Sequence, residues 1–159
     1  MIANNTFRGL SAQMGAALFL SSATQVNNPL FLLNNNVFDS NYAVNGAGMY
    51  LENGNIVMKN NSFMFNRGES GGAIYLSCFD TALINTLPFV IDGVSPNEIP
   101  TKCNIFITQG NMFFNNTGRD GAAIKWTKDR PVIDLNSTKF VNNTATVYGN
   151  DISSFPKAI

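Results

Sequence analysis

The sequence predicts an all-β fold, a right-handed parallel β-helix (solenoid) of about five to six coils with three short strands per coil and one long loop insertion. A motif of about 25 residues recurs along the chain in register, and each copy has the length of one coil in a stack. No segment shows the helical period of about 3.6 residues. Asparagine accounts for about one residue in seven, yet the chain is too rich in Phe, Ile, Leu and Val to be disordered, so stacked polar ladders are expected.

Each copy of the motif contains a Phe, a polar position three residues later, and a small-residue cluster that ends in an aliphatic side chain. The five copies begin at Phe7, Phe38, Phe63, Phe113 and Phe140. The middle three copies keep identical spacings, and the third reads Phe-Met-Phe-Asn, four residues, then Gly-Gly-Ala-Ile. The first copy has Leu10 in place of Asn, and the last is one residue longer. These two are expected to form end coils, which often depart from a repeat.

Each coil is expected to begin with a short apolar strand before the Phe. These strands are Leu30–Leu33, Asn55–Met58, Ile105–Ile107 and Val132–Leu135. A polar corner such as Asn34-Asn35-Asn36 then leads into the Phe strand, and a second corner follows the polar position after the Phe. The Gly-Ala-aliphatic strand closes the turn, because small residues let the backbone bend where a Cβ would crowd it.

Equivalent residues of successive coils lie about 4.8 Å apart in a parallel stack, so they form columns. The five motif Phe residues are expected to form one interior column. A second interior column contains Leu18, Met49, Ile74 and Ile124. One amide ladder contains Asn5, Asn36, Asn61 and Asn111, with Thr138 last. The other amide ladder contains Asn41, Asn66, Asn116 and Asn143. Stacked amides donate and accept along the column while they bind backbone groups of the corners.

The motifs Gly71-Gly72-Ala73-Ile74 and Phe63-x-x-Asn66 resemble the repeat of the polymorphic outer-membrane proteins of chlamydiae. The asparagine-rich composition and the closing segment 148–156 are more similar to the large β-helical surface proteins of ciliated protists. The resemblance covers about 150 residues and rests on short motifs. It implies that this chain, like the repeats of both groups, is a module of a much longer surface protein. Leu10 and the block around Gly149 depart from the family pattern.

The chain is expected to form a single domain over residues 1–159. Its coils are placed near 1–28, 29–53, 54–77, 104–128 and 131–155, with the loop insertion at 78–103. Residue 1 is expected to be an internal residue of a longer chain, since the start has neither the basic nor the apolar region of a secretory signal. Open strand edges at both ends are expected to be capped by further coils of the same polypeptide or by protein partners.

The composition excludes several classes of function. Ten acidic and ten basic residues leave no net charge, which argues against nucleic acid as a partner. No segment is long enough to span a bilayer, so direct membrane insertion is not expected. Histidine is absent, the carboxylates are scattered, and no Cys-x-x-Cys spacing occurs. No catalytic residue, cofactor or metal site is therefore expected.

The only two cysteines, Cys78 and Cys103, flank the insertion. A disulfide between them would close a loop of about 25 residues and stabilise the fold by about 3 kcal/mol; two unpaired buried thiols are the alternative. The centre of the loop is apolar and is the expected partner-contact surface. Its residues are Leu87, Pro88, Phe89, Val90 and Ile91. The same segment would equally serve to cover one face of the stack.

Five sequons for N-glycosylation occur, at Asn4, Asn60, Asn115, Asn136 and Asn142. In a secreted protein they would accept glycans. An asparagine-rich chain also generates sequons by chance, and an inward ladder residue cannot carry a sugar. We therefore expect one or two of them to be used.

Because β-helices host polysaccharide-cleaving enzymes, a carbohydrate site is an alternative for this chain. Charged residues gather in two aligned corners, at Arg67, Glu69, Arg119 and Asp120. Glu69 and Asp120 lie one position apart and would be the carboxylate pair that glycoside hydrolysis requires. Surface ion pairing explains the same residues more simply. Three aromatic side chains are expected to face outward, where they could stack on sugar rings; the more common role of such residues is to cover a strand face. They are Tyr50, Tyr75 and Trp126.

The leading hypothesis from the sequence is a non-catalytic structural or adhesive module of a large extracellular or cell-surface protein, which mediates protein–protein contacts. The first alternative is a carbohydrate-binding or polysaccharide-cleaving β-helix with its site at the charged corner, in which case glycans are partners. The second is an intracellular assembly subunit, which requires both cysteines to be free.

Overall fold

The structure, a computed structural model, describes residues 1–21, 30–78, 103–128 and 130–154, which form twenty strands and no helix. The strands fall into five layers of four. The first layer contains β1 (Ile2–Ala3), β2 (Thr6–Arg8), β3 (Ser11–Met14) and β4 (Leu18–Ser21). The second contains β5 (Leu30–Asn34), β6 (Val37–Asp39), β7 (Tyr42–Asn45) and β8 (Met49–Glu52). The third contains β9 (Asn55–Lys59), β10 (Ser62–Met64), β11 (Arg67–Ser70) and β12 (Ile74–Ser77). The fourth contains β13 (Ile105–Ile107), β14 (Met112–Phe114), β15 (Thr117–Asp120) and β16 (Ile124–Trp126). The fifth contains β17 (Val132–Ile133), β18 (Lys139–Val141), β19 (Thr144–Tyr148) and β20 (Ile152–Ser154).

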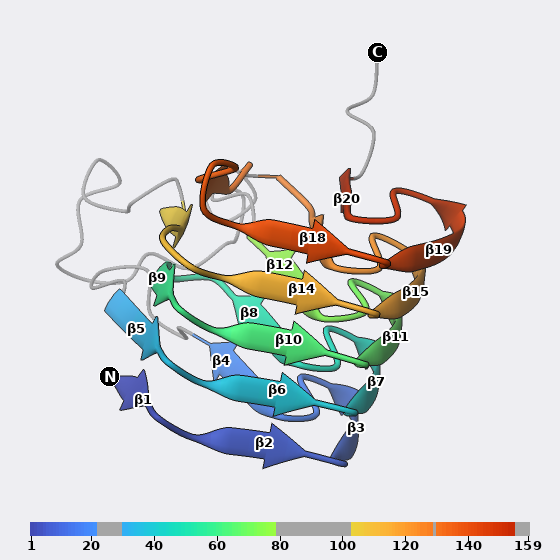
Figure 1. The fold of residues 1–159 in the computed structure, drawn as a ribbon, viewed down its shortest axis with the longest axis horizontal. Coiled ribbons are helices and arrows are strands. Elements are labelled where there is room, and N and C mark those ends of the chain that lie inside the picture. Colours follow the sequence, from blue (N-terminus) through green and yellow to red (C-terminus); the bar gives the residue numbers. More distant parts are fainter. Residues whose placement is uncertain (22–29, 79–102, 129, 155–159) are drawn as a thin grey trace, which may run out of the picture.

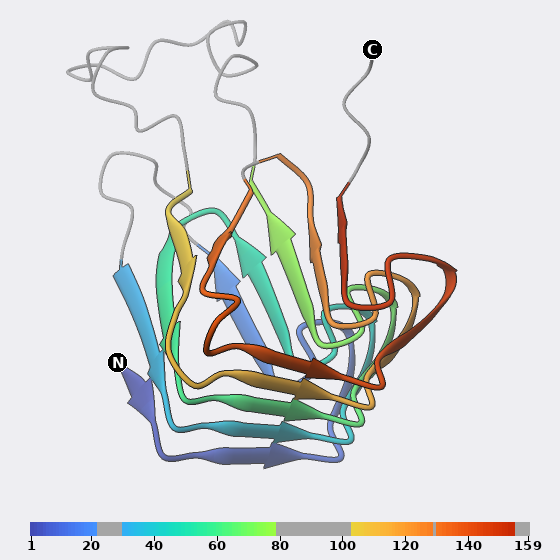
Figure 2. The same cartoon turned by 45° about the horizontal axis from the view of Figure 1, so that its top comes forward.

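Equivalent strands of the five layers pair in parallel and form four sheets, so the fold is a parallel β-solenoid (Figure 1). Sheet A begins with β1, sheet B with β2, sheet C with β3 and sheet D with β4. One complete turn separates neighbouring strands of a sheet, and the stack spans about four turns. The expected five to six coils of three strands are therefore wrong. The additional strand of each layer belongs to sheet C and lies in the segment where the sequence predicts a corner (Figure 2).

The register of the sheets aligns the repeat motif. Phe63 pairs with Phe38 on one side and with Phe113 on the other. The five motif Phe rings stack along the solenoid, with neighbouring centroids 4.4 to 5.1 Å apart. Ile74 pairs with Met49 and Ile124 in the same way. A one-residue slip would turn every one of these side chains outward, so the columns fix the register.

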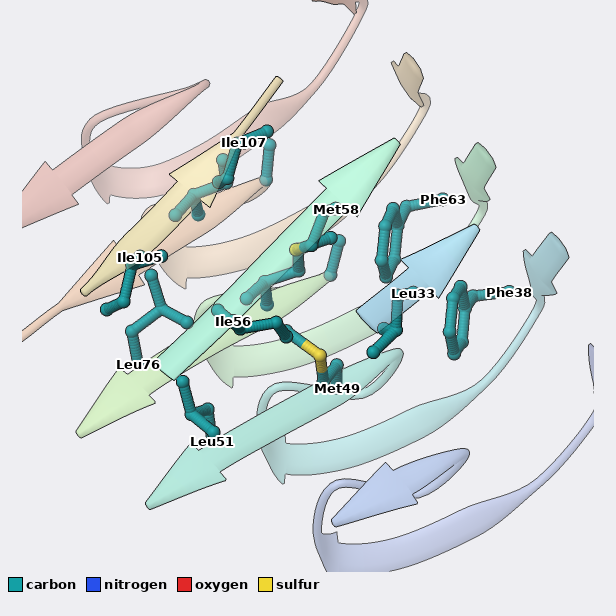
Figure 3. Packing of buried hydrophobic residues seen from close by; sticks show 14 of the residues in the cluster. Leu33, Phe38, Met49, Leu51, Ile56, Met58, Phe63, Leu76, Ile105 and Ile107 are labelled. Atoms are coloured by element: carbon teal, nitrogen blue, oxygen red, sulfur yellow. The ribbon is translucent and has the colours of Figure 1, made fainter. Parts of the chain in front are cut away.

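The hydrophobic core lies between sheets A, B and D, as Figure 3 shows for its central layers. Sheet A contributes Leu33, Ile56, Met58, Ile105 and Ile107, and sheet D contributes Met49, Leu51, Ile74 and Leu76. Sheet C instead turns small residues inward, namely Ala43, Gly68 and Gly118. A Cβ on Gly68 would lie 3.2 Å from the Ala43 carbonyl oxygen and 3.4 Å from the Gly71 carbonyl oxygen. Sheet C therefore packs directly on the backbone of the Gly-Gly-Ala segment.

Both predicted amide ladders are present, and all their members are buried except Asn5 in the first layer, which is exposed. The Asn66 Oδ1 accepts hydrogen bonds from the backbone N of Asn41 at 3.2 Å and from its Nδ2 at 2.9 Å. The Asn66 Nδ2 donates to the carbonyl oxygen of Phe38 at 2.9 Å and to the Asn116 Oδ1 at 3.1 Å. Each inner ladder residue thus joins three successive layers and satisfies a backbone group that the corner would otherwise leave unpaired.

Left-handed backbone conformations recur at the corners. The corner between sheets A and B has positive φ at Asn4, Asn35, Asn60 and Gly110. The corner between sheets B and C has positive φ at Gly9, Ser40, Phe65, Asn115 and Asn142. Asn and Gly tolerate this conformation, whereas a bulky side chain does not. Phe65, with φ of 54°, is the exception among these corner residues.

Replacing Phe65 by Asn should raise the free energy of unfolding by about 1 kcal/mol, because Asn relieves the left-handed strain. The ring is 51% exposed and contacts Phe114 edge-on at 5.5 Å, so its removal offsets part of the gain. Urea denaturation measures the change. Phe65→Ala is the control, because it removes the ring and keeps the strain, and it should give no gain. A Phe65→Asn protein no more stable than Phe65→Ala would contradict this account.

Candidate functional site

The outer face of sheet C carries a groove of about 440 Å³. It is lined by Tyr42, Arg67, Gly68, Glu69, Thr117, Gly118, Arg119, Thr144 and Thr146. These residues come from β7, β11, β15 and β19, four neighbouring strands. Alternate residues of each strand face outward, so two columns of polar side chains run across the sheet. Sequence reasoning found the charged residues but missed Tyr42 and the three threonines, because it did not place a sheet here.

Three of the four residues expected at the charged corner line this groove, and Asp120 does not. Arg67 pairs with Thr117, and Ser70 pairs with Asp120, which aligns Glu69 with Arg119. Asp120 faces the opposite side of the strand and binds Lys125. The alternative of a catalytic carboxylate pair, Glu69 with Asp120, does not fit this arrangement. The groove holds one carboxylate, and glycoside hydrolysis requires two.

The expected ion pairing at the corner is also not found. Within the described residues the ion pairs are Arg8–Asp39 and Lys125–Asp120, both at 2.7 Å. Arg67, Glu69 and Arg119 are exposed and lie outside these pairs. Neither guanidinium group has an ion pair or a hydrogen-bond partner among the described residues, and both lie beside a half-exposed Tyr42 ring and threonine hydroxyls. Such a set of groups suits a carboxylated or sulfated sugar, since arginine binds planar oxyanions with paired donors.

A second polar cluster lies on the other side of sheet C, where the ends of its strands meet the outer face of sheet D. The Lys125 Nζ is 2.7 Å from the Asp120 Oδ1 and 3.3 Å from the Tyr148 hydroxyl, and Lys125 is 1% exposed. Tyr50 and Tyr75 stack beside it, with centroids 5.3 Å apart. Burial raises the pKa of Tyr75, and the neighbouring Tyr50 and Asp120 raise it further.

Of the three aromatic residues expected to face outward, Tyr50 and Tyr75 cover the strand face of sheet D, and the outward placement of Trp126 is wrong. Tyr50 is 7% exposed and stacks between layers of the cluster instead of facing open solvent. Trp126 packs partly buried against the core. It lies two residues after Ile124 and so shares the inward direction of that residue.

Replacing Lys125 by Met should lower the free energy of unfolding by about 2 kcal/mol, because it leaves the Asp120 carboxylate without its cation. The Asp120 side chain is 14% exposed, so water can still solvate part of the carboxylate, which keeps the expected loss of stability moderate. Adding Asp120→Asn removes the uncompensated charge and should restore more than half of the loss. A double-mutant cycle by urea denaturation measures both. If the double variant were less stable than Lys125→Met alone, the ion-pair account would be wrong.

Cys78 and Cys103 form a disulfide. Cys78 follows β12 and is buried in the core cluster, and Cys103 precedes β13, so the bond closes the base of the insertion. The expected disulfide is confirmed, and the alternative of two unpaired thiols is wrong. The predicted contact residues Leu87 to Ile91 lie outside the described residues.

Four of the five sequons occupy left-handed corners, namely Asn4, Asn60, Asn115 and Asn142. Each directly precedes a ladder asparagine, which is exposed after Asn4 and buried after the other three, so the ladder residue is the middle residue of the sequon and not the glycan acceptor. Asn4, Asn60 and Asn142 are exposed, Asn115 is half-buried, and the fifth acceptor, Asn136, is exposed in a turn. None of the five acceptor asparagines is therefore an inward ladder residue, and burial in a ladder does not prevent their glycosylation.

No protein-family model, curated protein or solved structure matches this chain. In the described part of the chain, no helix is long and apolar enough to cross a membrane. The same residues contain no cluster of three or more His, Cys, Asp or Glu side chains that could hold a metal ion.

Proposed function

We propose that this chain is a non-catalytic structural and adhesive module of a larger extracellular or cell-surface protein. The observation that carries the proposal is the Cys78–Cys103 disulfide, because such bonds persist in oxidising compartments. The bond closes the base of the insertion between the third and fourth layers. The apolar segment Leu87 to Ile91 of that insertion is the proposed contact with protein partners. An intracellular assembly subunit requires two free thiols and is disfavoured.

The hydrogen bonds and the ion pair of the buried polar groups support a structural role, because these groups bind one another within the stack. The inner ladder amides bind each other and the corner backbone, and the buried lysine binds Asp120. Arg67, Glu69 and Arg119 of the sheet C groove face solvent. For the finer geometry we propose a right-handed winding, because connections between parallel strands of one sheet almost always have that hand.

A non-reducing peptide map combined with the intact mass of the native protein tests the proposal. A peptide that joins Cys78 to Cys103, with added glycan mass at one or more of the exposed sequons, is expected. A bare chain with two free thiols would overturn the extracellular assignment. Asn115→Gln is expected to remove less glycan than Asn60→Gln, because Asn115 is less exposed.

A second candidate function, the binding of acidic carbohydrate, is favoured by the free arginines of the sheet C groove. We expect uronate-containing or sulfated glycans to bind on a glycan array. Arg67→Ala and Arg119→Ala should each weaken binding at least about tenfold, since each removes a charge-assisted contact. Glu69→Gln tests whether the carboxylate takes part. Lys139→Ala, an exposed cation on sheet B, is the control and should bind normally. If Lys139→Ala weakened glycan binding as much as the two arginine variants, binding would depend on the general positive charge of the surface and not on the groove.

A further inference from the structure

The first amide ladder ends in the first layer with an acceptor that no described residue fills. The Oδ1 of each inner ladder residue accepts two hydrogen bonds from the layer before it. The Asn36 Oδ1 accepts from the backbone N of Asn5 at 3.1 Å and from its Nδ2 at 3.2 Å, and the Asn61 Oδ1 accepts from Asn36 twice at 3.0 Å. Asn5 repeats the donor half of this pattern, but no described residue donates to its Oδ1. The edge formed by β1 to β4, the N-terminal edge, therefore presents an unused amide acceptor in register with the ladder.

Apolar side chains on the same edge are exposed where their counterparts in inner layers are buried. Phe7 stacks on Phe38 at 5.0 Å through one face of its ring, and it is only half-buried whereas Phe38 is 0% exposed. Leu10 is 41% exposed at the position where the inner layers bury Asn41 and Asn66. Phe19 is 45% exposed beyond its stack with Tyr50. A further layer would cover all three.

The last layer also leaves the ring of Phe140 half-buried, with Phe113 on one face. It differs from the first layer in its polar groups, because its own residues fill positions that a following ladder would take. The Asn143 Nδ2 donates to the Asp151 Oδ1 at 3.0 Å, in the role that the next ladder amide plays in inner layers. The backbone N of Ala145 donates to the Asn150 Oδ1 at 2.9 Å. In the other ladder Thr138 replaces the asparagine, and it has no amide to continue the column. The pairing of β15 with β19 also contains a register shift, so a regular sixth layer would not match β19.

We propose that the N-terminal edge is a docking surface for one further layer of this Asn-x-Phe repeat, continuous with β1 in the same polypeptide, and that the opposite edge is the closed end of the stack. The incoming layer donates its ladder amide to the Asn5 Oδ1 and stacks its Phe on Phe7. A second copy of this chain does not fit, because its closed edge would offer Thr138 and Asp151 in place of free amide donors. The docking edge deepens the proposed structural role and rests on it.

The test extends the full chain by one layer at either end. In the first variant a copy of residues 30–56 is placed directly before Met1. The Asn36 of the copy then precedes Asn5 by 25 positions, which is also the spacing between Asn36 and Asn61 in the native chain. The backbone N–H groups of Thr6 and Ser11 should then bind the new layer, as Val37 and Tyr42 bind Asn5 and Leu10 at 2.8 Å. Hydrogen exchange at these two amides should slow about tenfold or more. Amides of the inner layers report that the host remains folded.

The controls separate this surface from general β-sheet pairing. The same extension with Asn36→Ala and Phe38→Ala in the copy should leave exchange at Thr6 and Ser11 unchanged. A copy of residues 52–77 placed after Ser154 should exchange as an unfolded chain. Protection at neither end, or equal protection at both, would overturn the proposal. A dimer of the unextended chain in light scattering, with Thr6 and Ser11 protected, would make a second copy the occupant and overturn it too. None of these readouts depends on secretion or adhesion, so the proposed function can fail independently.

Discussion

Replacing Phe63 by Ala should lower the free energy of unfolding by about 3–5 kcal/mol, as expected for a buried aromatic whose cavity cannot close. The ring is 0% exposed and stacks on Phe38 at 4.4 Å and on Phe113 at 5.0 Å. It also fills the space beside Gly48, where a Cβ would approach the Phe63 ring to 2.8 Å. Backbone stacking in all four sheets prevents the neighbours from moving into the void. Urea denaturation of the purified variant measures the change.

Two matched variants locate this effect in the column. Met64→Ala changes the next residue of the same strand, which points away from the core, and should cost less than about 1 kcal/mol. Phe140→Ala lies at the end of the column, half-buried, and should cost less than Phe63→Ala because one face of its ring has no Phe neighbour among the described residues. A loss below about 1 kcal/mol for Phe63→Ala would mean that the column does not carry the stability of the stack.

The inward columns were predictable from the sequence because every copy of the motif sets the same positions. Phe63, Ile74 and Asn66 recur at fixed spacings, and parallel stacking turns fixed spacing into spatial contact. The disulfide was predictable for a related reason, since Cys78 and Cys103 flank one insertion between adjacent layers.

Sheet C was missed because its segments share no common strand pattern: β7 and β19 contain β-branched and aromatic residues, but the central segments do not. Arg67-Gly68-Glu69-Ser70 combines charges with glycine, which have low strand propensity, and its inward position is too small to show apolar alternation. Gly68 is required there because the sheet packs on a neighbouring backbone. Without a predicted strand, the alternation of side chains along it is not predicted either. The sequence therefore predicts Arg119 and Asp120 in one corner cluster, although they point to opposite sides of β15. The groove and the buried Lys125 pair both depend on that alternation.

Replacing Asn66 by Leu should lower the free energy of unfolding by about 4 kcal/mol, although leucine is similar in size and more hydrophobic. The substitution removes the acceptor of two Asn41 donors and the donor to the Phe38 carbonyl oxygen. These groups are buried where water cannot replace the lost partner, and each unpaired group costs about 1–3 kcal/mol. Urea denaturation and the exchange rate of the Asn41 amide measure the loss together.

The control for this ladder is Asn35→Gly, which alters an exposed corner asparagine one residue before the other ladder and should change stability by less than about 0.5 kcal/mol, because glycine accepts its left-handed φ. Asn66→Asp adds a test of polarity. The new carboxylate keeps the acceptor toward Asn41 but faces the Phe38 carbonyl oxygen and the Asn116 Oδ1, two acceptors, so its folded-state pKa should lie above that of the unfolded chain. The variant should therefore lose stability as the pH rises above about 4, whereas Asn66→Leu should not. A pH-independent Asn66→Asp protein would mean that the ladder admits water or reorients its amides, and the ladder would then not hold the layers in register.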